Sequence, residues 1–218
     1  MTAPLSRLIE EVAAGRTIVL LDDLRRGGEG ALVFPADGVN ARSITLMALK
    51  ARGLVCLAIT AGRALQLGLM LQPRRGEQRL DSSFTMSIEA RHGVTTGISA
   101  ADRAATIAAA VAADADAASI SSPGHIFPVV AADGGILERP GFAEAAIDLM
   151  RLAGRSPTAV FCRVLRDDGR MADTASLLAL AQEHDLCLGS IGEMVALRAA
   201  SQASATLVRF RTPEAIAG

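Results

Sequence analysis

The chain has 218 residues, is 50% hydrophobic and 21% charged, and carries a net charge of −1 at pH 7. This length suits one large domain that can bury its own core. The balanced charge and the absence of Trp and Tyr argue against a nucleic-acid surface. No run of about 20 apolar residues is present to cross a membrane. Three widely spaced cysteines without a C-x-x-C pair predict neither zinc nor disulfides, and we expect a cytoplasmic protein.

Hydrophobic periodicity predicts a mixture of helices and strands along most of the chain. In chain order we expect a helix at 5–14, strands at 17–21 and 31–34, a helix at 40–51, a strand at 54–60, a helix at 61–67, a strand at 83–89, a helix at 100–112, a strand at 127–131, a helix at 143–152, a strand at 160–165 and a helix at 174–184. This irregular order predicts a single α+β domain with a mixed sheet and surrounding helices. We place that domain at residues 1–198 and a C-terminal tail at 199–218.

Four Gly-punctuated polar loops lie next to predicted strands, at residues 22–30, 93–103, 123–128 and 134–141. Loops of this kind commonly carry functional side chains. Asp22 and Asp23 follow an apolar strand, where they could act as general bases or metal ligands, or form a solvated turn. Arg139 could hold a phosphate group or make a surface ion pair.

Two of these loops allow a structural as well as a functional interpretation. Thr95 and Thr96 offer hydroxyl and backbone N–H groups ahead of a helix, as a phosphate cradle would. The same stretch has the spacing of a helix cap, with Ser99 three residues before Asp102. His125 lies between two prolines, so it could present its imidazole to a ligand or hydrogen-bond to the backbone.

The four loops together resemble the signature of the 3,4-dihydroxy-2-butanone-4-phosphate synthase family. The matching segments include LLDD, GEGALVFPAD, GVTTGISAADRA, PGHIFPVVA and GGILERPG, and the resemblance extends over about residues 8–195. It implies an α+β domain that works as a homodimer, with active sites near the subunit interface. It also implies a magnesium-dependent reaction that converts ribulose 5-phosphate into dihydroxybutanone phosphate and formate.

Three departures from the family pattern lie where that chemistry is expected. The metal-binding Glu and His of the family correspond here to Gly27 and Phe142, and a further active-site Glu corresponds to Arg163. Magnesium is bound by hard oxygen ligands, which glycine and phenylalanine side chains do not offer. We therefore predict no metal and no other cofactor.

The remaining matches define the predicted site. We expect catalytic roles for Asp22, Asp23, Glu29 and His125, and substrate binding by Arg26, Thr95, Thr96, Asp102, Arg103 and Arg139. The expected partners are a small anionic substrate and a second copy of the chain, with no nucleic acid and no membrane. Three interpretations stay open: a repurposed metal-independent enzyme acting on a small phosphorylated or anionic carbonyl compound, a non-catalytic ligand-binding or partner subunit, and a genuine synthase.

Overall fold

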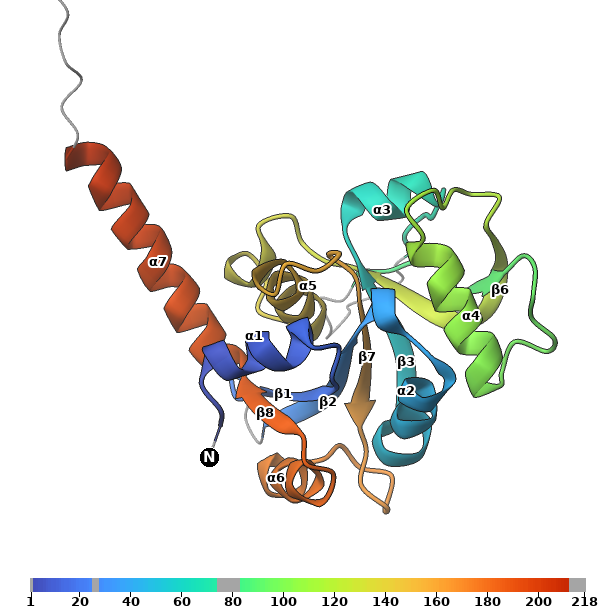
Figure 1. The fold of residues 1–218 in the computed structure, drawn as a ribbon, viewed down its shortest axis with the longest axis horizontal. Coiled ribbons are helices and arrows are strands. Elements are labelled where there is room, and N and C mark those ends of the chain that lie inside the picture. The colour runs from blue at the N-terminus through green and yellow to red at the C-terminus, as the bar shows by residue number, and fades with distance from the viewer. Residues whose placement is uncertain (1, 25–27, 74–82, 212–218) are drawn as a thin grey trace, which may run out of the picture.

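The computed structural model describes residues 2–24, 28–73 and 83–211, with the backbone alone described from residue 203. In these residues one mixed sheet is flanked by helices on both faces (Figure 1). The strands are β1 (Ile18–Asp22), β2 (Glu29–Pro35), β3 (Arg52–Ile59), β4 (Ser83–Phe84), β5 (Ile88–Ala90), β6 (Ile120–Val130), β7 (Ala159–Val164) and β8 (Cys187–Ser190). The helices are α1 (Leu5–Ala13), α2 (Ala41–Leu46), α3 (Ala61–Gln66), α4 (Ala100–Val111), α5 (Phe142–Leu152), α6 (Thr174–Glu183) and α7 (Ile191–Arg211), with shorter turns η1 (Ala36–Gly38), η2 (Met47–Ala51) and η3 (Gly135–Leu137).

The strands run in the order β4-β6-β3-β7-β2-β1-β8, and β5 pairs with β6 outside this path. Strand β7 is antiparallel to both of its neighbours, β2 and β3, whereas β3 pairs in parallel with β6 and β1 with β8. This combination confirms the predicted α+β class with a mixed sheet.

Alternation along the strands separates two hydrophobic clusters, one on each face of the sheet. On β1, Val19 and Leu21 join the cluster that contains residues of α2, α4 and α6. Ile18 and Leu20 join the opposite cluster, which contains residues of α1, α5 and the start of α7. The second face, called the α5 face below, carries the candidate site.

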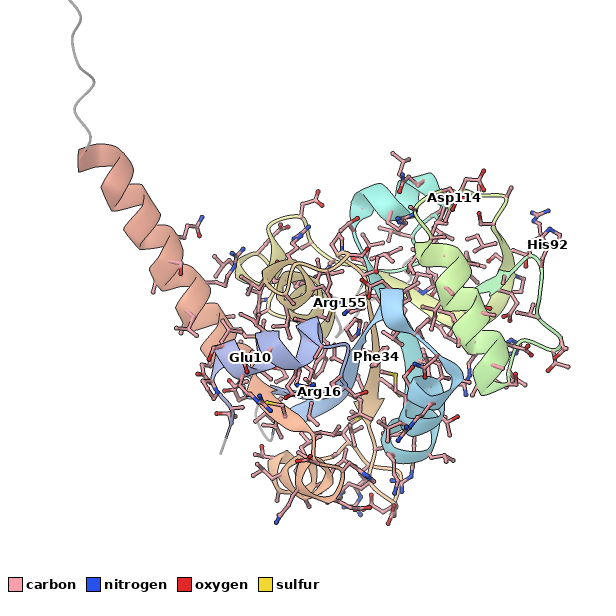
Figure 2. The ribbon with its side chains drawn as sticks, in the orientation of Figure 1. Glu10, Arg16, Phe34, His92, Asp114 and Arg155 are labelled. Carbon is pink, nitrogen blue, oxygen red and sulfur yellow. The ribbon has the colours of Figure 1, made fainter. Side chains whose placement is uncertain are left out.

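Figure 2 shows side chains filling the space between the sheet and both helical layers. It also places the loop that carries His92 at the right edge of the view, far from Glu10 on α1. No helix in the described part of the chain is both long and apolar enough to span a bilayer.

The structure differs from the predicted elements at four places. β6 begins at Ile120 rather than at residue 127, and the predicted strand at 83–89 is two short strands, β4 and β5. β8, which has four residues, was not predicted, and α7 continues as a helix across the expected boundary at 198/199. These segments have weak hydrophobic periodicity, and their pairing partners are distant in sequence. The division into a 1–198 domain and a tail stays a prediction.

Candidate functional site

A cavity of about 320 Å³ opens on the α5 face, between strands β1, β3, β6 and β7 and the first turn of α5. Its volume is at the lower end of the range of small-molecule pockets. Four charged residues line it, namely Asp22, Arg139, Glu144 and Arg163. The other lining side chains are apolar, including Leu54, Val129 and Phe161. A few polar groups in a mostly apolar cavity are typical of a ligand site.

The strand register places three charged residues in one row across the α5 face. Asp22 is opposite Glu29 in the β1–β2 pair, and Ala31 is opposite Arg163 in the β2–β7 pair. Glu29 is therefore the diagonal neighbour of Arg163, within reach of a long side chain. The two form an ion pair. Asp22 at the end of this row is only 2% exposed.

Arg139 lies in the loop between η3 and α5 and is held on several sides. It forms an ion pair with Glu144, which is 2% exposed. Its guanidinium also donates hydrogen bonds to the Ser83 hydroxyl at 2.9 Å and to the Val130 carbonyl at 2.7 Å. Glu144 additionally accepts a hydrogen bond from the backbone N–H of Ala132. Arg139 therefore makes an ion pair with a buried partner and lines the pocket, whereas its predicted phosphate-binding role stays a prediction.

Two phenylalanine rings close the pocket beside the charged row. The centroids of Phe142 and Phe161 are 6.5 Å apart and the rings are inclined by 24°. The Cζ atom of Arg163 lies over the Phe142 ring, 5.9 Å from its centroid. This position allows a cation–π interaction. Phe142 and Arg163 therefore give the pocket an aromatic and cationic wall at two of the positions where the sequence departs from the family pattern.

Asp23 has a different environment from its neighbour Asp22. Its carboxylate accepts a hydrogen bond from the Ser190 hydroxyl at 2.6 Å and another from the backbone N–H of Gly192 at 2.9 Å. These contacts cap the start of α7. Asp23 is not among the residues that line the pocket, and its predicted catalytic role stays a prediction.

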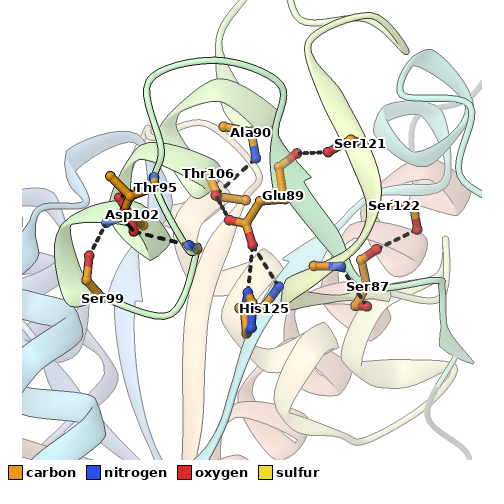
Figure 3. Close-up of polar contacts among 12 residues, drawn as sticks. Ser87, Glu89, Ala90, Thr95, Ser99, Asp102, Thr106, Ser121, Ser122 and His125 are labelled. Atoms are coloured by element: carbon orange, nitrogen blue, oxygen red, sulfur yellow. Dashed lines mark hydrogen bonds and ion pairs between the residues drawn. The ribbon is translucent and has the colours of Figure 1, made fainter.

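A second polar network lies on β5, β6 and α4 (Figure 3). The Nδ1 atom of His125 is 2.7 Å from one carboxylate oxygen of Glu89, and the Thr106 hydroxyl donates to the other at 2.6 Å. The His125 side chain is 42% exposed. His125 is four residues from the pocket residue Val129 along β6, which corresponds to about 13 Å.

The loop before α4 is organised by Asp102. Its carboxylate accepts hydrogen bonds from the Thr95 hydroxyl and from the backbone N–H of Gly97 (Figure 3). The hydrogen bond from the Thr95 hydroxyl is the main cause that lowers the pKa of Asp102, against the effect of desolvation. The Ser99 hydroxyl accepts from the Asp102 N–H and caps α4. The helix-cap interpretation of this loop is therefore confirmed, and a phosphate-binding role for Thr95 stays a prediction.

The remaining predicted substrate residues lie apart from the pocket or outside the described residues. Thr96 is exposed in the same loop. Arg103 lies on α4, and its charge acts to lower the pKa of Cys162, which burial raises to about 11. Cys162 belongs to the cluster opposite the α5 face. Arg26 and Gly27 fall outside the described residues.

Sequence reasoning missed two carboxylates that organise the two networks, Glu89 and Glu144. Glu89 lies in the alternating segment at 83–89, where a partly buried acid indicates a specific partner. Glu144 follows Gly141 at the start of α5, where an acidic side chain commonly caps or binds a loop. In both cases, the partner lies on another element, so spacing alone did not identify it.

The model of the family described as 3,4-dihydroxy-2-butanone 4-phosphate synthase matches residues 6–197. Proteins of that name are 46% identical over 213 residues in Pseudomonas aeruginosa and 39% identical over 205 residues in Pectobacterium atrosepticum. These matches cover 98% and 94% of this chain. They cover 56% of the first relative and 94% of the second, so the chain spans little more than half of the Pseudomonas protein.

Solved structures agree with this similarity. A two-domain 3,4-dihydroxy-2-butanone 4-phosphate synthase from A. baumannii is 42% identical with a TM-score of 0.86, covering 90% of this chain and 58% of that one. A synthase in complex with two magnesium ions is 30% identical with a TM-score of 0.85, covering 92% and 98%. The prediction of no metal and no cofactor is therefore wrong, because a synthase of the same family, 30% identical to this chain, is in complex with two magnesium ions.

Magnesium requires hard oxygen ligands, and few side chains of the pocket lining provide them. The described residues contain no group of three or more His, Cys, Asp or Glu side chains placed to hold a metal ion. The carboxylates that line the pocket are Asp22 and Glu144, and Glu144 is engaged by Arg139. Among the residues that the structure describes, the pocket lining therefore offers a magnesium ion two carboxylates and no histidine. From the family model, the relatives and the solved structures, the chain belongs to the 3,4-dihydroxy-2-butanone 4-phosphate synthase family.

Proposed function

We propose that this chain binds ribulose 5-phosphate in the α5-face pocket and converts it into dihydroxybutanone phosphate and formate. The observation that carries the proposal is similarity over nearly the whole chain to relatives that bear the synthase name. This evidence favours the family reaction over the repurposed, metal-independent chemistry expected from the sequence. The proposed reaction needs no other substrate, because the atoms of ribulose 5-phosphate equal those of the two products.

Asp22 is the proposed proton carrier of the pocket. Enolisation beside a carbonyl requires a base within reach of the carbon-bound proton. Asp22 is a buried carboxylate that lines the cavity. Arg139, fixed by Glu144 and Ser83, presents a positive charge that can stabilise a negative oxygen of the substrate.

The proposed working form is a homodimer, as the resemblance implies. His125 is half-exposed and does not line the pocket of its own chain. A site near the subunit interface would allow His125 and Thr95 of one copy to contact the ligand of the other. Their predicted roles in catalysis and substrate binding are compatible with this arrangement.

The test measures formate release from ribulose 5-phosphate, with and without magnesium. A synthase that has the metal-binding Glu and His of the family is assayed alongside as the positive control. We expect formate from the wild type and a loss of at least 100-fold in Asp22→Asn. Asp167→Asn is the matched control, because Asp167 is 91% exposed and outside the pocket. Absence of formate from a folded wild-type dimer would reject the proposed reaction.

A second candidate is ligand binding without turnover. The specific observation in its favour is the Phe142 and Arg163 wall, which introduces an aromatic ring and a cation beside Asp22. This candidate predicts that ribulose 5-phosphate raises the melting temperature while no formate is released. Release of formate in the assay above would exclude it.

A further inference from the structure

The wall made by Phe142, Phe161 and Arg163, called the aromatic wall below, has a geometry that suggests a particular ligand. Phe161 and Arg163 are two residues apart on β7 and so face the same side of the sheet. Phe142, the first residue of α5, is stacked against Phe161 and lies beneath the guanidinium of Arg163. An apolar surface and a positive charge therefore meet at one place in the cavity.

Arg163 is held in this position by Glu29 on the neighbouring strand. The two side chains are 33% and 29% exposed, but the Glu29 oxygen of the pair is itself buried. Separating the pair would leave this buried charge without its partner. A guanidinium has five N–H donors in a planar fork that matches a phosphate or carboxylate group. A ligand anion would therefore share Arg163 with Glu29 rather than replace it.

Apart from the charged Asp22, Arg139 and Glu144, the other side chains that line the cavity beside the aromatic wall are apolar. Leu54, Phe84 and Val129 are among them, and none of these three can hydrogen-bond to a hydroxyl group. Hydroxyl groups that lose water without gaining a protein partner weaken binding. A flat apolar group gains contact area and ring stacking in the same space.

We infer that the aromatic wall is a subsite for a small acid whose body is apolar and aromatic, with its anionic group bound by Arg163. This inference rests on the proposed function only in taking the α5-face cavity as the ligand site. It goes further because it assigns the pocket a second class of ligand, to which the polyhydroxylated ribulose 5-phosphate does not belong. Acids of this class would compete with ribulose 5-phosphate for the pocket.

The direct test compares phenyl phosphate with glycerol 3-phosphate by isothermal titration calorimetry at constant pH and ionic strength. Both probes carry a phosphate monoester, so the difference between their affinities reports the contribution of the rest of the ligand. We expect phenyl phosphate to bind about tenfold more tightly to the wild-type dimer. Equal affinity, tighter binding of glycerol 3-phosphate, or no binding of phenyl phosphate would overturn the inference.

Two variants separate the anion-binding and aromatic parts of the subsite. Arg163→Gln should weaken phenyl phosphate binding at least tenfold, whereas Arg170→Gln is a control with the same charge change at a residue 78% exposed and outside the pocket. Phe142→Leu should remove most of the preference for phenyl phosphate and leave glycerol 3-phosphate binding within about twofold. Unchanged phenyl phosphate affinity in either Arg163→Gln or Phe142→Leu would contradict the assignment.

Competition in the formate assay distinguishes failure of this inference from failure of the proposed function. Formate release that phenyl phosphate does not inhibit would support the family reaction and reject the subsite. Tight phenyl phosphate binding with no formate release would support the subsite and reject the family reaction.

Discussion

The pocket on the α5 face and the loop network around Asp102 and His125 are built in different ways. The pocket is organised by buried acids on a sheet and a helix, with Glu144 and Asp22 each 2% exposed. The loop network instead consists of short hydrogen bonds close to the surface, where the His125 side chain is half-exposed. The pocket acids therefore depend on partners inside the fold, whereas the loop network depends on contacts close to the surface. The contrast predicts unequal effects when each region is perturbed.

The largest effect is expected when Glu144 is removed from the pocket. Glu144→Ala leaves the guanidinium of Arg139 without its buried counter-charge and the Ala132 N–H without its acceptor. Breaking a buried ion pair on one side costs about 3 kcal/mol or more of unfolding free energy. Urea denaturation measures this loss. The control Glu183→Ala breaks the exposed pair with Lys50 and should change stability by less than about 0.5 kcal/mol. Similar losses in both variants would contradict the contrast between buried and exposed pairs.

A smaller effect is expected from Gly97→Ala in the loop network. Gly97 has φ +83°, and an added Cβ would lie 2.0 Å from a Glu89 oxygen and 2.6 Å from Nδ1 of His125. The variant should lose about 1–3 kcal/mol of unfolding free energy and separate His125 from Glu89. Thermal unfolding reports the stability, and the NMR chemical shifts of the His125 ring report the separation. Gly93→Ala is a control with a similar φ of +77° but open space around the Cβ. If both glycine variants lose the same stability, backbone strain alone accounts for the effect.

A pH effect should identify the contribution of Asp102. Its pKa is lowered in the folded protein, first by the hydrogen bond from the Thr95 hydroxyl. The stabilisation is therefore fully present above the ordinary pKa of 3.8 and is lost as the pH falls through the lowered folded-state pKa. Thr95→Val should raise the pKa of Asp102, measured by NMR titration, and reduce the stability lost on acidification. An unchanged pKa would mean that the backbone N–H groups alone set it.

The smallest effect concerns the thiols, which test how closely the sheet is packed. Burial raises the pKa of Cys56 and of Cys162, whereas Cys187 on β8 is only half-buried, and its pKa is also raised by burial. Because the thiolate is the reactive form, we expect a thiol reagent at pH 8 to modify Cys187 first. The time course of modification should begin with a fast phase from Cys187, and Cys187→Ser should remove that phase. Reaction of Cys56 at the same rate would show that the pocket opens to the reagent.

The regular part of the fold was predictable because its periodicity is local. The strands around Ile18–Asp22 and Ala159–Val164 are continuous apolar runs, and both were predicted within about two residues. β8 was missed because four residues carry too little pattern, and β6 was shortened because its first half contains Ser, Pro and Gly. Local sequence reports the preference of a segment, but not the partners that stabilise it.

The site was predictable only in part for a related reason. Asp22 was identified because an acid at the end of an apolar strand is a local signal. The ion pair of Glu29 with Arg163 depends on the register of β2 with β7, two strands that are far apart in sequence. Asp22 faces the cavity because it is on the same side of β1 as Ile18 and Leu20, and the predicted strand ended at residue 21, so the sequence treated Asp22 and Asp23 alike.

The contacts of Asp23 have a consequence for mutational screens. Asp22 lines the cavity, whereas the adjacent Asp23 fastens the chain to Ser190 and Gly192 at the start of α7. Loss of Asp23 would free the backbone that positions Asp22, so a screen that scores growth or turnover would rank both acids as essential. Measuring folding and ligand affinity separately would distinguish the structural contacts of Asp23 from the proposed proton-carrier role of Asp22. Two neighbouring acids can thus have the same phenotype for different physical reasons.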